Sequence, residues 1–570
     1  MTARVVRVSG SLVEVEHLEG VSMFDVVALG ERGLPGEVVS IAGGRVTVQA
    51  YEDTGGLAPG HRAVAQGVPL SARLGPGLLG GVFDGLLRPL SGAGTWLRPG
   101  VAWTDDTDRR WSFAPSVTLG QPVRAGDELG SVTGGPLALR VLVPPGTSGQ
   151  VEQVADGGSY DARAVVAKVG GEPVALTTTW PVRRPRPFRE RLDDTEGLHT
   201  GQRVLDLLYP VARGRSAAVP GGFGTGKTVL LQQIAKWCDA DVIVYVGCGE
   251  RGNEMADVVE ELNALDDPRT GERLASRTVV VANTSNMPMM AREASIYSGV
   301  TVAEYFRDMG YHVVVIADST SRWAEALREF ASRTGALPAE EGYPAGLASA
   351  LAAFYERAGH VVTLGGRQGS VTIIGAFSPA GGDVTEPVTA HTERFVRCVW
   401  ALDRDLAYAR HYPAVAWSAS FSRDAGALAS WHSRQGDPGW AARRARVNAL
   451  LADADRLSAL AELVGVGAMP GSERVVMLAG RLLREGVLQQ SALSATDAFC
   501  STAKTAALVD AVFAVVATCN ALVDSGVPAV TVEEVDYGPI VRAREETGPD
   551  DPEGVRRQRD AMLAVLGGLS

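Results

Sequence analysis

A glycine-rich stretch near the middle of the chain constrains the fold more than any other feature. Residues 219–228 read VPGGFGTGKT, and the last eight match the G-x-x-x-x-G-K-[ST] pattern of a phosphate-binding loop. Glycines let successive backbone N–H groups curl around an anion, which a Cβ would obstruct. The apolar run Ala217–Val219 precedes the loop, and a helix is predicted from about Val229 to Trp237. That helix would point its positive N-terminal end at the phosphates of a nucleotide.

Two side chains of this loop carry specific chemistry. Lys227 can reach the β- and γ-phosphates of a nucleoside triphosphate, and the Thr228 hydroxyl can take part in a Mg²⁺ site. Most of the 54 basic residues are arginines. The lysines are those at positions 168, 227, 236 and 504. A planar guanidinium and a compact ammonium are not equivalent phosphate ligands, so the lysine kept in this loop indicates that an ammonium is needed there.

Length and charge bound the remaining possibilities. A chain of 570 residues predicts about three or four domains, and a net charge of −12 argues against a general nucleic-acid or anionic-membrane binder. The N-terminal segment lacks the apolar core of a signal peptide. The most apolar helix candidate, Ala507–Val523, carries Asp510 and Asn520 and is shorter than a typical span, so we expect no transmembrane segment. The five cysteines show neither disulfide nor metal-ligand spacing, which predicts buried, reduced thiols in an intracellular protein.

The apolar pattern changes four times along the chain. Residues 1–70 alternate in short runs separated by glycine-rich turns, which predicts a small β-barrel. Residues 71–112 and 190–434 predict a central α/β domain, interrupted by a β-rich insertion over 113–189. Residues 435–570 predict a helical domain with amphipathic stretches near 440–464, 473–486 and 502–523. The expected strands are, in the barrel, 4–8, 11–16, 36–41 and 45–50, and, in the central domain, 215–220, 241–247, 277–282, 312–317, 371–377 and 413–418.

Arginines crowd the exit of the insertion. They stand at positions 183, 184, 186, 189 and 191. An anion site is one interpretation, and a solvated or interdomain face is the one that we favour.

A second motif follows the phosphate loop at the end of an apolar strand. The run DVIVYVGCGERGNE begins at Asp241 and delivers Glu250, Arg251 and Glu254 at the carboxyl end of that strand, where ligands bind in open α/β sheets. A carboxylate there can polarise a water for in-line attack on a γ-phosphate. Glu254 could equally cap the next helix. Beside a phosphate loop we favour a catalytic role for Glu250.

A third motif, HVVVIADSTSRW, begins at His312. A hydrophobic strand that ends in Asp318 matches the Walker B pattern, which holds Mg²⁺ directly or through water. The pattern is weak alone, but it follows the phosphate loop in the expected order. Arg322 lies four residues further along.

Four stretches carry a family resemblance. GGFGTGKT, VGCGERGNEM, ADSTSRWAEALREFASRTGALPAEEGYPAGL and FSPAGGDVTEPVT resemble the catalytic A subunit of V-type and A-type rotary ATPases, and the similarity covers essentially the whole chain. The insertion is similar to the bulge that distinguishes this family from F-type catalytic chains. The intact loop and the GERGNE run differ from the B subunit, which has lost that loop. Departures from the family include Gly222, where a bulkier residue is common, Thr225, where eukaryotic members carry cysteine, and SPAGGD in place of SPPGGD.

The resemblance implies a fold and a set of site residues. The fold is an α/β P-loop (RecA-like) nucleotide-binding domain with an N-terminal β-barrel, a β-rich insertion and a C-terminal α-helical domain. Glu250 would orient the attacking water, Arg251 would contact the γ-phosphate, and Asp318 and Thr228 would hold Mg²⁺. Glu254 and Arg322 are secondary candidates. The implied nucleotide-binding residues are Gly221, Gly222, Phe223, Gly224, Thr225, Gly226, Lys227, Thr228, Val229, and the aromatic residues Tyr412 and Phe499 as two walls around adenine.

The resemblance also implies an assembly. The cofactor would be Mg²⁺ with ATP or ADP, in a hexamer of alternating A and B subunits whose B subunit supplies an arginine finger in trans. Central and peripheral stalk subunits would connect this ring to a membrane sector that carries H⁺ or Na⁺. The chain would then be a peripheral protein on the cytoplasmic side of a membrane, and no nucleic acid is expected as a partner.

Three alternatives stay open at this point. A homohexameric flagellar or type III secretion ATPase would lack the long β-rich insertion and would be active without a second chain. An RNA translocase resembling Rho would need a barrel with basic and stacking residues, but residues 1–70 contain several acidic side chains and only Phe24 and Tyr51 as aromatics. A non-catalytic ring member is disfavoured by the intact Lys227, Glu250 and Asp318.

Overall fold

The chain divides into two units that each draw on separate stretches of sequence. The structure is a computed structural model that describes residues 2–91, 99–100, 109–133, 137–267, 270–379, 382–383 and 385–569. The first unit comprises Met1–Asp193, Ala240–Phe377 and Thr385–Phe395. The second comprises Asp194–Asp239, Ser378–Val384 and Val396–Ser570.

The first unit begins with the predicted β-barrel. Its strands are β1 (Arg4–Ser9), β2 (Leu12–Glu16), β3 (Asp25–Leu29), β4 (Leu34–Ala42), β5 (Arg45–Ala50) and β6 (Ala63–Pro69), in the order β1-β2-β5-β4-β3-β6. Alternation drives the fold, because Val13 and Val15 face inward opposite Val48 and Val46. The Val5 N–H donates to the His61 carbonyl at 2.8 Å, which closes the sheet on itself. The barrel is confirmed, and β3 and β6 are two strands that the sequence pattern missed.

The β-rich insertion consists of two four-stranded antiparallel sheets. One has the order β10-β13-β15-β16 and the other β12-β11-β9-β14. In β9, Trp111 and Phe113 are buried while Ser112 and Ala114 are exposed, so a period of two places an apolar layer inside. The strands are β9 (Trp111–Pro115), β10 (Pro122–Val123), β11 (Glu128–Thr133), β12 (Leu139–Leu142), β13 (Gly149–Val154), β14 (Gly158–Tyr160), β15 (Val165–Val169) and β16 (Glu172–Ala175). The chain then returns through β17 (Thr178–Pro181), which pairs with β7 (Ser71–Leu74).

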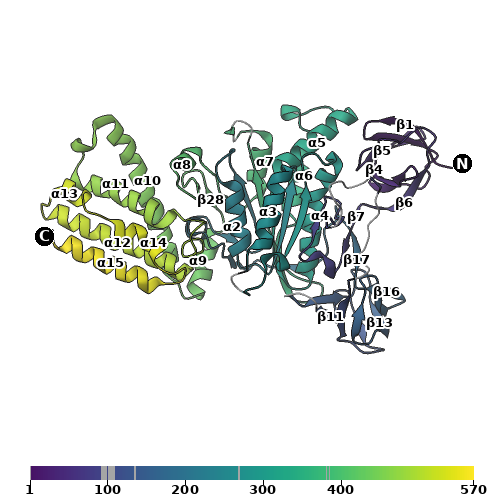
Figure 1. Ribbon diagram of the computed structural model, residues 1–570, viewed down its shortest axis with the longest axis horizontal. Helices are drawn as coiled ribbons and strands as arrows, with labels where there is room; N and C mark the ends of the chain where they lie inside the picture. Colours follow the sequence, from purple (N-terminus) through teal and green to yellow (C-terminus); the bar gives the residue numbers. More distant parts are fainter. Residues whose placement is uncertain are drawn as a thin grey trace. The chain divides into compact units, whose positions relative to one another are not determined.

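A parallel sheet forms the core of the first unit (Figure 1). Neighbouring strands are, in order, β8 (Val82–Phe83), β23 (Thr278–Asn283), β22 (Val242–Cys248), β24 (His312–Asp318) and β26 (Gln368–Phe377). Strands β22, β23 and β26 are almost wholly buried, as expected for strands covered on both faces. At one edge, β25 (Gly359–Val362) pairs antiparallel with β26, and β18 (Glu190–Arg191) pairs with β25. Helices of this unit are α3 (Gly252–Ala264), α4 (Met289–Asp308), α5 (Thr320–Thr334), α6 (Leu347–Tyr355) and α7 (Pro387–Phe395), of which α4 packs on β22, β24 and β26.

Two of the five arginines at the exit of the insertion pair with acidic side chains of other elements. Arg183 pairs with Glu37 of the barrel at 3.3 Å and with Glu293 of α4 at 2.6 Å. Arg186 pairs with Asp308 at 2.7 Å. These contacts join the barrel, the insertion's exit and α4. These contacts support the interpretation of an interdomain face rather than that of an anion site.

The second unit contains the strand that precedes the phosphate loop. Strand β21 (Ser216–Pro220) lies parallel to β27 (Cys398–Val399), which pairs antiparallel with β28 (Phe421–Ser422). The strand expected at 413–418 is wrong, because these residues are irregular and Val415 forms one isolated bridge with Leu402. Pro413 lacks an N–H and cannot support a central strand at this point. The short β19 (Gly197–Leu198) and β20 (Val211–Ala212) also pair with each other.

Helices make up the rest of the second unit (Figure 1). They are α1 (Arg203–Leu208), α2 (Lys227–Trp237), α8 (Arg404–Tyr408), α9 (Ala425–Arg434), α10 (Trp440–Val464), α11 (Gly471–Leu483), α12 (Thr502–Asp524), α13 (Ala529–Glu533), α14 (Gly538–Glu546) and α15 (Pro552–Gly567). The predicted helices near 440–464, 473–486 and 502–523 are confirmed as α10, α11 and α12. A single π-type turn over Arg484–Leu488 follows α11.

Helix α12 is the one described helix that is long and apolar enough to cross a membrane. It has 23 residues and is longer than the apolar candidate Ala507–Val523 of the sequence. In its most apolar window, 56% of the residues are buried inside the protein. It packs against α11 and α15, and its buried side chains include Leu508, Val512 and Val515. A buried core helix has the same length and composition, and its packing identifies α12 as one.

The cysteines behave as the sequence predicted. All five lie in the described part of the chain, are buried and take part in no disulfide. Burial raises the pKa of the Cys248 and Cys398 thiols to about 12, which keeps them protonated at neutral pH.

Candidate active site

The phosphate loop of the second unit has the geometry of an anion nest. Strand β21 is fully buried, and α2 begins at Lys227 directly after the loop. Gly224 and Gly226 have φ angles of +80° and +81°, in the left-handed region that only glycine adopts easily. No side chain caps the start of α2, so its first N–H groups can serve an anion. The predicted strand, loop and helix are therefore all present.

Within the loop, two polar side chains hold the conformation. The Thr225 hydroxyl donates to the Gly222 carbonyl at 2.8 Å. The Lys227 ammonium donates to the hydroxyl of Ser378, which follows Phe377 at the end of a buried segment. Sequence reasoning missed Ser378, although it opens the SPAGGD stretch that carried the family resemblance. Gly221 and Thr225 are buried, whereas Phe223 and Val229 are exposed.

The two aromatic candidates lie at opposite ends of α2. A Cβ on Gly226, at the N-terminal end, would lie 3.1 Å from the Tyr412 ring, so this ring packs against the loop. Phe499 instead contacts Trp237, the last residue of α2, with ring centroids 5.3 Å apart. Eleven helical residues span roughly 16 Å at 1.5 Å per residue. The structure therefore brings Tyr412, but not Phe499, to the phosphate loop.

The surroundings of Phe499 explain its position. The ring meets His199 edge-on at 5.4 Å, and a Cβ on Gly201 would lie 2.7 Å from it. Burial lowers the pKa of His199, but the Asp206 carboxylate 3.0 Å away outweighs burial and raises that pKa to about 9. His199 is therefore charged at neutral pH, and its ion pair fixes the ring against which Phe499 packs.

Buried ionic groups anchor the segment that carries Phe499. Arg203 and Asp497 are fully buried and form an ion pair at 2.7 Å. Asp497 also pairs with Arg544 at 2.5 Å and accepts from the Ser491 N–H at 2.7 Å. The buried ammonium of Lys504 donates to three backbone carbonyls, those of Thr496, Arg544 and Thr547.

Removing one partner from this network should be costly. We expect Asp497→Asn to destabilise the protein by about 3–5 kcal/mol, because it leaves the Arg203 guanidinium buried with no carboxylate. The measurement is thermal unfolding followed by circular dichroism. Asp453→Asn is the matched control, since Asp453 is exposed and forms a loose ion pair with Arg456 at 3.5 Å. We expect this variant to lower the free energy of unfolding by less than about 1 kcal/mol. Equal melting temperatures for the two variants would contradict a structural role for Asp497.

In the first unit, the ends of three parallel strands bring the remaining candidates to one edge of the sheet. Strand β22 pairs with β23 at Cys248 and Asn283, and with β24 at Gly247 and Asp318. Glu250 follows β22 after the turn at Gly249. Carboxyl ends of parallel strands are where ligands bind in such sheets, so Glu250 and Asp318 occupy the expected edge.

The turn that carries Glu250 is tied to neighbouring segments. The Glu250 carbonyl accepts from the Ser285 N–H at 2.9 Å, and the Gly249 N–H donates to the Asn283 carbonyl at 2.7 Å. Gly249 has φ +73°, and a Cβ there would lie 2.6 Å from Cβ of Arg322. Glycine is thus required both for the turn and for the close approach of α5. Arg251 occupies the N-cap position of α3 without a side-chain capping hydrogen bond, and it is exposed.

Two neighbours tune the charges at this edge. Arg322 bonds to Glu325 at 3.0 Å, and this hydrogen bond, together with the charges of Glu325, Glu250 and Glu254, raises its pKa. The Tyr245 hydroxyl donates to Oδ2 of the buried Asp318 at 3.3 Å. Burial and the Asp318 charge raise the pKa of Tyr245, so it stays a neutral donor. Sequence reasoning missed Tyr245, although a tyrosine inside an apolar strand signals a hidden hydrogen-bond partner.

The oxygen donors fit a magnesium ion chemically. Asp318 offers a carboxylate and Thr228 a hydroxyl, which are hard ligands of the kind Mg²⁺ prefers. Among the described residues, no group of three His, Cys, Asp or Glu side chains is arranged to hold a metal. Mg²⁺ usually takes one or two protein ligands together with substrate phosphates and water, so a single carboxylate or hydroxyl meets its need for protein ligands.

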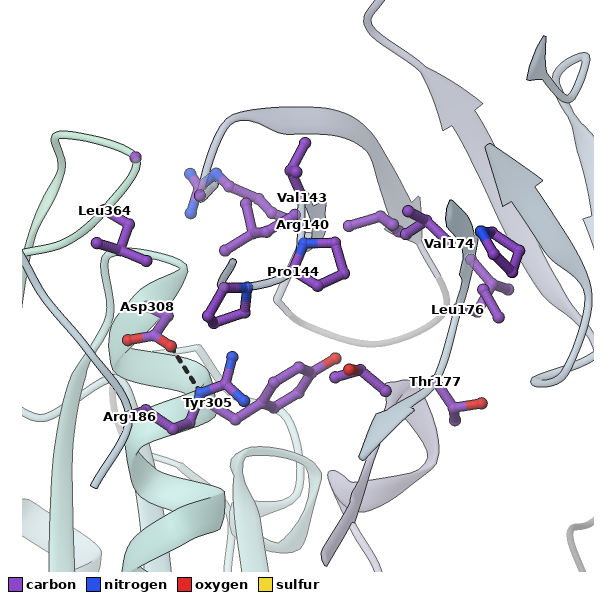
Figure 2. Close-up of a pocket in the computed structure, with 18 residues that line it drawn as sticks. Arg140, Val143, Pro144, Val174, Leu176, Thr177, Arg186, Tyr305, Asp308 and Leu364 are labelled. Carbon is purple, nitrogen blue, oxygen red and sulfur yellow. Dashed lines mark hydrogen bonds and ion pairs between the residues drawn. The ribbon is translucent and has the colours of Figure 1, made fainter. Parts of the chain in front are cut away.

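A separate cavity lies where the insertion meets α4 (Figure 2). Its walls include Val143 and Pro144 from the insertion and Tyr305 from α4, and Arg186 and Asp308 form their ion pair at its edge. The volume is about 90 Å³, enough for a few waters. The buried ion pair and apolar walls indicate a packing gap between the insertion and the core.

Fold and site together define a class. A glycine nest at the start of a helix, in a chain whose parallel strands end in Glu250 and Asp318, is the construction of P-loop nucleotide-binding proteins. The chemistry of such sites is phosphoryl transfer.

Four family models place the chain more closely. The ATP synthase alpha/beta family nucleotide-binding domain matches residues 201–422, and the beta-barrel domain of the same family matches residues 5–67. The ATP synthase alpha/beta subunit barrel-sandwich domain matches residues 104–183, and the C-terminal domain of V and A type ATP synthase matches residues 429–525. The chain belongs to the ATP synthase alpha/beta family. Both the expected resemblance and the expected fold class are confirmed.

Individual relatives agree with this assignment. A V-type ATP synthase alpha chain from Anaeromyxobacter sp. (strain K) is 50% identical over 545 residues, covering 94% of each chain. A V-type ATP synthase alpha chain from Nitrosococcus oceani is 48% identical over 555 residues, covering 95% of this chain and 93% of its own. Among solved structures, the assembled ATPase EscN of the enteropathogenic E. coli type III secretion system aligns with a TM-score of 0.63 at 22% identity. That alignment covers 90% of this chain and 100% of EscN, and it shows a shared fold.

Proposed function

We propose that this chain is the catalytic subunit of a V/A-type rotary ATPase, which hydrolyses or synthesises ATP and couples that reaction to ion transport. The observation that carries the proposal is an intact phosphate loop in a chain 50% identical to a V-type ATP synthase alpha chain over 94% of its length. The nucleotide is ATP or ADP with Mg²⁺.

Binding is divided among a few groups. The loop N–H groups from Gly221 to Thr228 and the Lys227 ammonium neutralise the phosphates. When bound, Mg²⁺ supplies positive charge to the β- and γ-phosphates, and Thr228 and Asp318 are the residues that would hold it. Tyr412 serves as the platform for the base, supported by its contact with the loop. The adenine role implied for Phe499 lacks this support, because that ring is packed against His199 and Trp237.

Catalysis depends on the Glu250 turn. Glu250 orients a water for in-line attack on the γ-phosphate, and Arg251 contacts that phosphate as negative charge develops on it. Arg322 and Glu254 position this turn through charge and packing. No covalent enzyme intermediate is required, since positioning and electrostatics supply most of the rate.

The assembly is part of the proposal. We infer an alternating hexamer with a homologous non-catalytic B subunit, whose arginine would act in trans at the interface and add about 10³–10⁵ in rate. Binding and release of nucleotide would be coupled to movements of the helical residues 435–570, which push a central stalk. Peripheral stalk subunits and a membrane sector that transports protons or sodium ions complete the machine. The chain then works as a peripheral protein on the cytoplasmic side of the membrane, and nucleic acid is not a partner.

The other interpretations receive less support. A secretion-type homohexamer is disfavoured because residues 104–183 match the barrel-sandwich domain and because EscN is only 22% identical. A Rho-like translocase is disfavoured by the net charge of −12. A non-catalytic ring member is disfavoured by the intact Lys227, Glu250 and Asp318.

The native complex tests this function. We expect a large assembly from source cells that contains equal amounts of a second, homologous chain together with stalk proteins. Native mass spectrometry gives the composition of the assembly, and MgATPase activity is measured on the same fraction. An active ring built from this chain alone would contradict the proposal and favour a secretion-type enzyme.

A further inference from the structure

The segment after β27 runs alongside the strand that leads into the phosphate loop. The backbone N–H of Trp400 donates to the Ala218 carbonyl at 2.8 Å, and the backbone N–H of Leu402 donates to the Pro220 carbonyl at 2.8 Å. Each step of two residues in one segment therefore matches a step of two in the other. Continued by one more step, this register places Arg404 beside Gly222.

The Arg404 guanidinium packs directly on that glycine. An ideal Cβ on Gly222 would lie 2.9 Å from Nε, 3.0 Å from Nη2 and 3.3 Å from Cζ of Arg404. The φ angle of Gly222 is outside the left-handed region, so the backbone does not require glycine here. Glycine at this position instead leaves the space that the guanidinium occupies.

The local backbone holds Arg404 at this place. Arg404 is the first residue of α8, and the Asp403 carboxylate caps this helix by accepting from the Leu406 N–H at 2.9 Å. Asp403 is thus already engaged in the cap. The Arg404 side chain is exposed, and among the described residues its guanidinium forms neither an ion pair nor a hydrogen bond.

An exposed, unpaired guanidinium on an anion nest has an evident partner. Arginine presents a planar fork of N–H donors that fits phosphate oxygens. The geometry points to Arg404 as a further phosphate-binding residue, which contacts the terminal phosphates of the nucleotide from the Gly222 side of the loop while Lys227 approaches from the helix. This inference rests on the proposed function and adds to it a phosphate ligand from the same chain.

The first test compares nucleotides that differ in phosphate number. Isothermal titration calorimetry on the full chain with Mg²⁺ measures Kd for ATP, ADP and AMP. We expect Arg404→Ala to raise the Kd for ATP about tenfold, the Kd for ADP less, and the Kd for AMP hardly at all, since the contact is with terminal phosphates. Arg404→Lys should recover part of the lost ATP affinity. Added salt should narrow the difference in Kd for ATP between Arg404→Ala and the wild type. Arg456→Ala is the matched control, because it removes an exposed arginine of α10 and should leave every Kd unchanged.

The second test displaces the guanidinium without removing it. Gly222→Ala pushes the flexible end of Arg404 away from the loop, and we expect it to weaken ATP binding about as much as Arg404→Ala. In the Arg404→Ala background the same change should have little further effect, since the pair shares one interaction. Additive losses would overturn the inference, because Gly222→Ala would then act on the loop alone.

The outcomes separate this inference from the proposed function. A wild-type chain that binds no ATP would contradict the proposed function itself. A wild-type chain that binds ATP, with an unchanged Kd in Arg404→Ala, would overturn the inference and leave the function standing. Equal losses for ATP, ADP and AMP would also overturn it, because they would indicate a structural role.

Discussion

Glu250→Gln is expected to remove ATP turnover while nucleotide binding is retained. Glutamine has the same shape as glutamate, so the turn between β22 and α3, fixed by backbone hydrogen bonds to Ser285 and Asn283, should persist. What is lost is the negative charge that polarises the attacking water, and loss of a general base typically costs about 10²–10⁴ in rate. We expect a loss in this range in the MgATPase activity of the native assembly, with ATP affinity changed by less than about threefold.

A matched variant separates charge at this turn from charge in general. Glu260→Gln also removes a carboxylate, but Glu260 is a residue of α3 beyond the turn, and its variant should retain wild-type turnover. Retained turnover in Glu250→Gln would remove Glu250 from its proposed role. A parallel loss of ATP affinity would point to a binding function for Glu250 instead.

Lys227→Ala is expected to reduce both binding and turnover. The Lys227 ammonium stands at the start of α2 beside the glycine nest, where it is bonded to Ser378. Removing a charged hydrogen-bond donor from a phosphate site costs about 1.5–3 kcal/mol, which corresponds to an increase in Kd for ATP of roughly 10- to 150-fold. Turnover should fall by a further factor of about 10²–10³, because negative charge on the phosphates loses its stabiliser in the transition state.

The same helix offers the control. Lys236 lies in the last turn of α2, with its ammonium 4.7 Å from the centre of the Trp237 ring, and Lys236→Ala should bind ATP normally. Lys227→Arg should fail to restore turnover, since the bulkier planar cation does not fit a nest built around an ammonium. Normal ATP affinity in Lys227→Ala, measured by calorimetry, would contradict the phosphate role.

Local patterns predicted most of the fold. The helix expected from about Val229 begins at Lys227 and ends at Trp237, and the expected strand over 241–247 is β22. Errors occur where the local signal is weak. Strand β6 is largely exposed, so its apolar alternation is faint, and the apolar run after Pro413 resembles a strand that its backbone does not form.

The sequence likewise predicts some residues of the candidate site and not others. Lys227, Glu250 and Asp318 stand in motifs that bind phosphate or metal wherever a strand delivers them, so their places at a helix start and at strand ends follow from the sequence. The partners of these residues do not follow from it. Ser378 lies 151 positions after Lys227, and Asp318 lies 73 positions after Tyr245, and no local pattern links such residues.

The sequence by itself determined the phosphate loop, the succession of β-rich, α/β and helical regions, and the family. Each of these depends on residues that are neighbours in the chain, through turn conformation and apolar periodicity. Only the tertiary structure decided that Phe499 packs at the far end of α2 from Tyr412. It also decided that Arg183 and Arg186 pair with acids of other elements, and that Arg404 lies on Gly222. Contacts of this kind are set when distant segments pack together and side chains fill the remaining space, which local sequence does not specify.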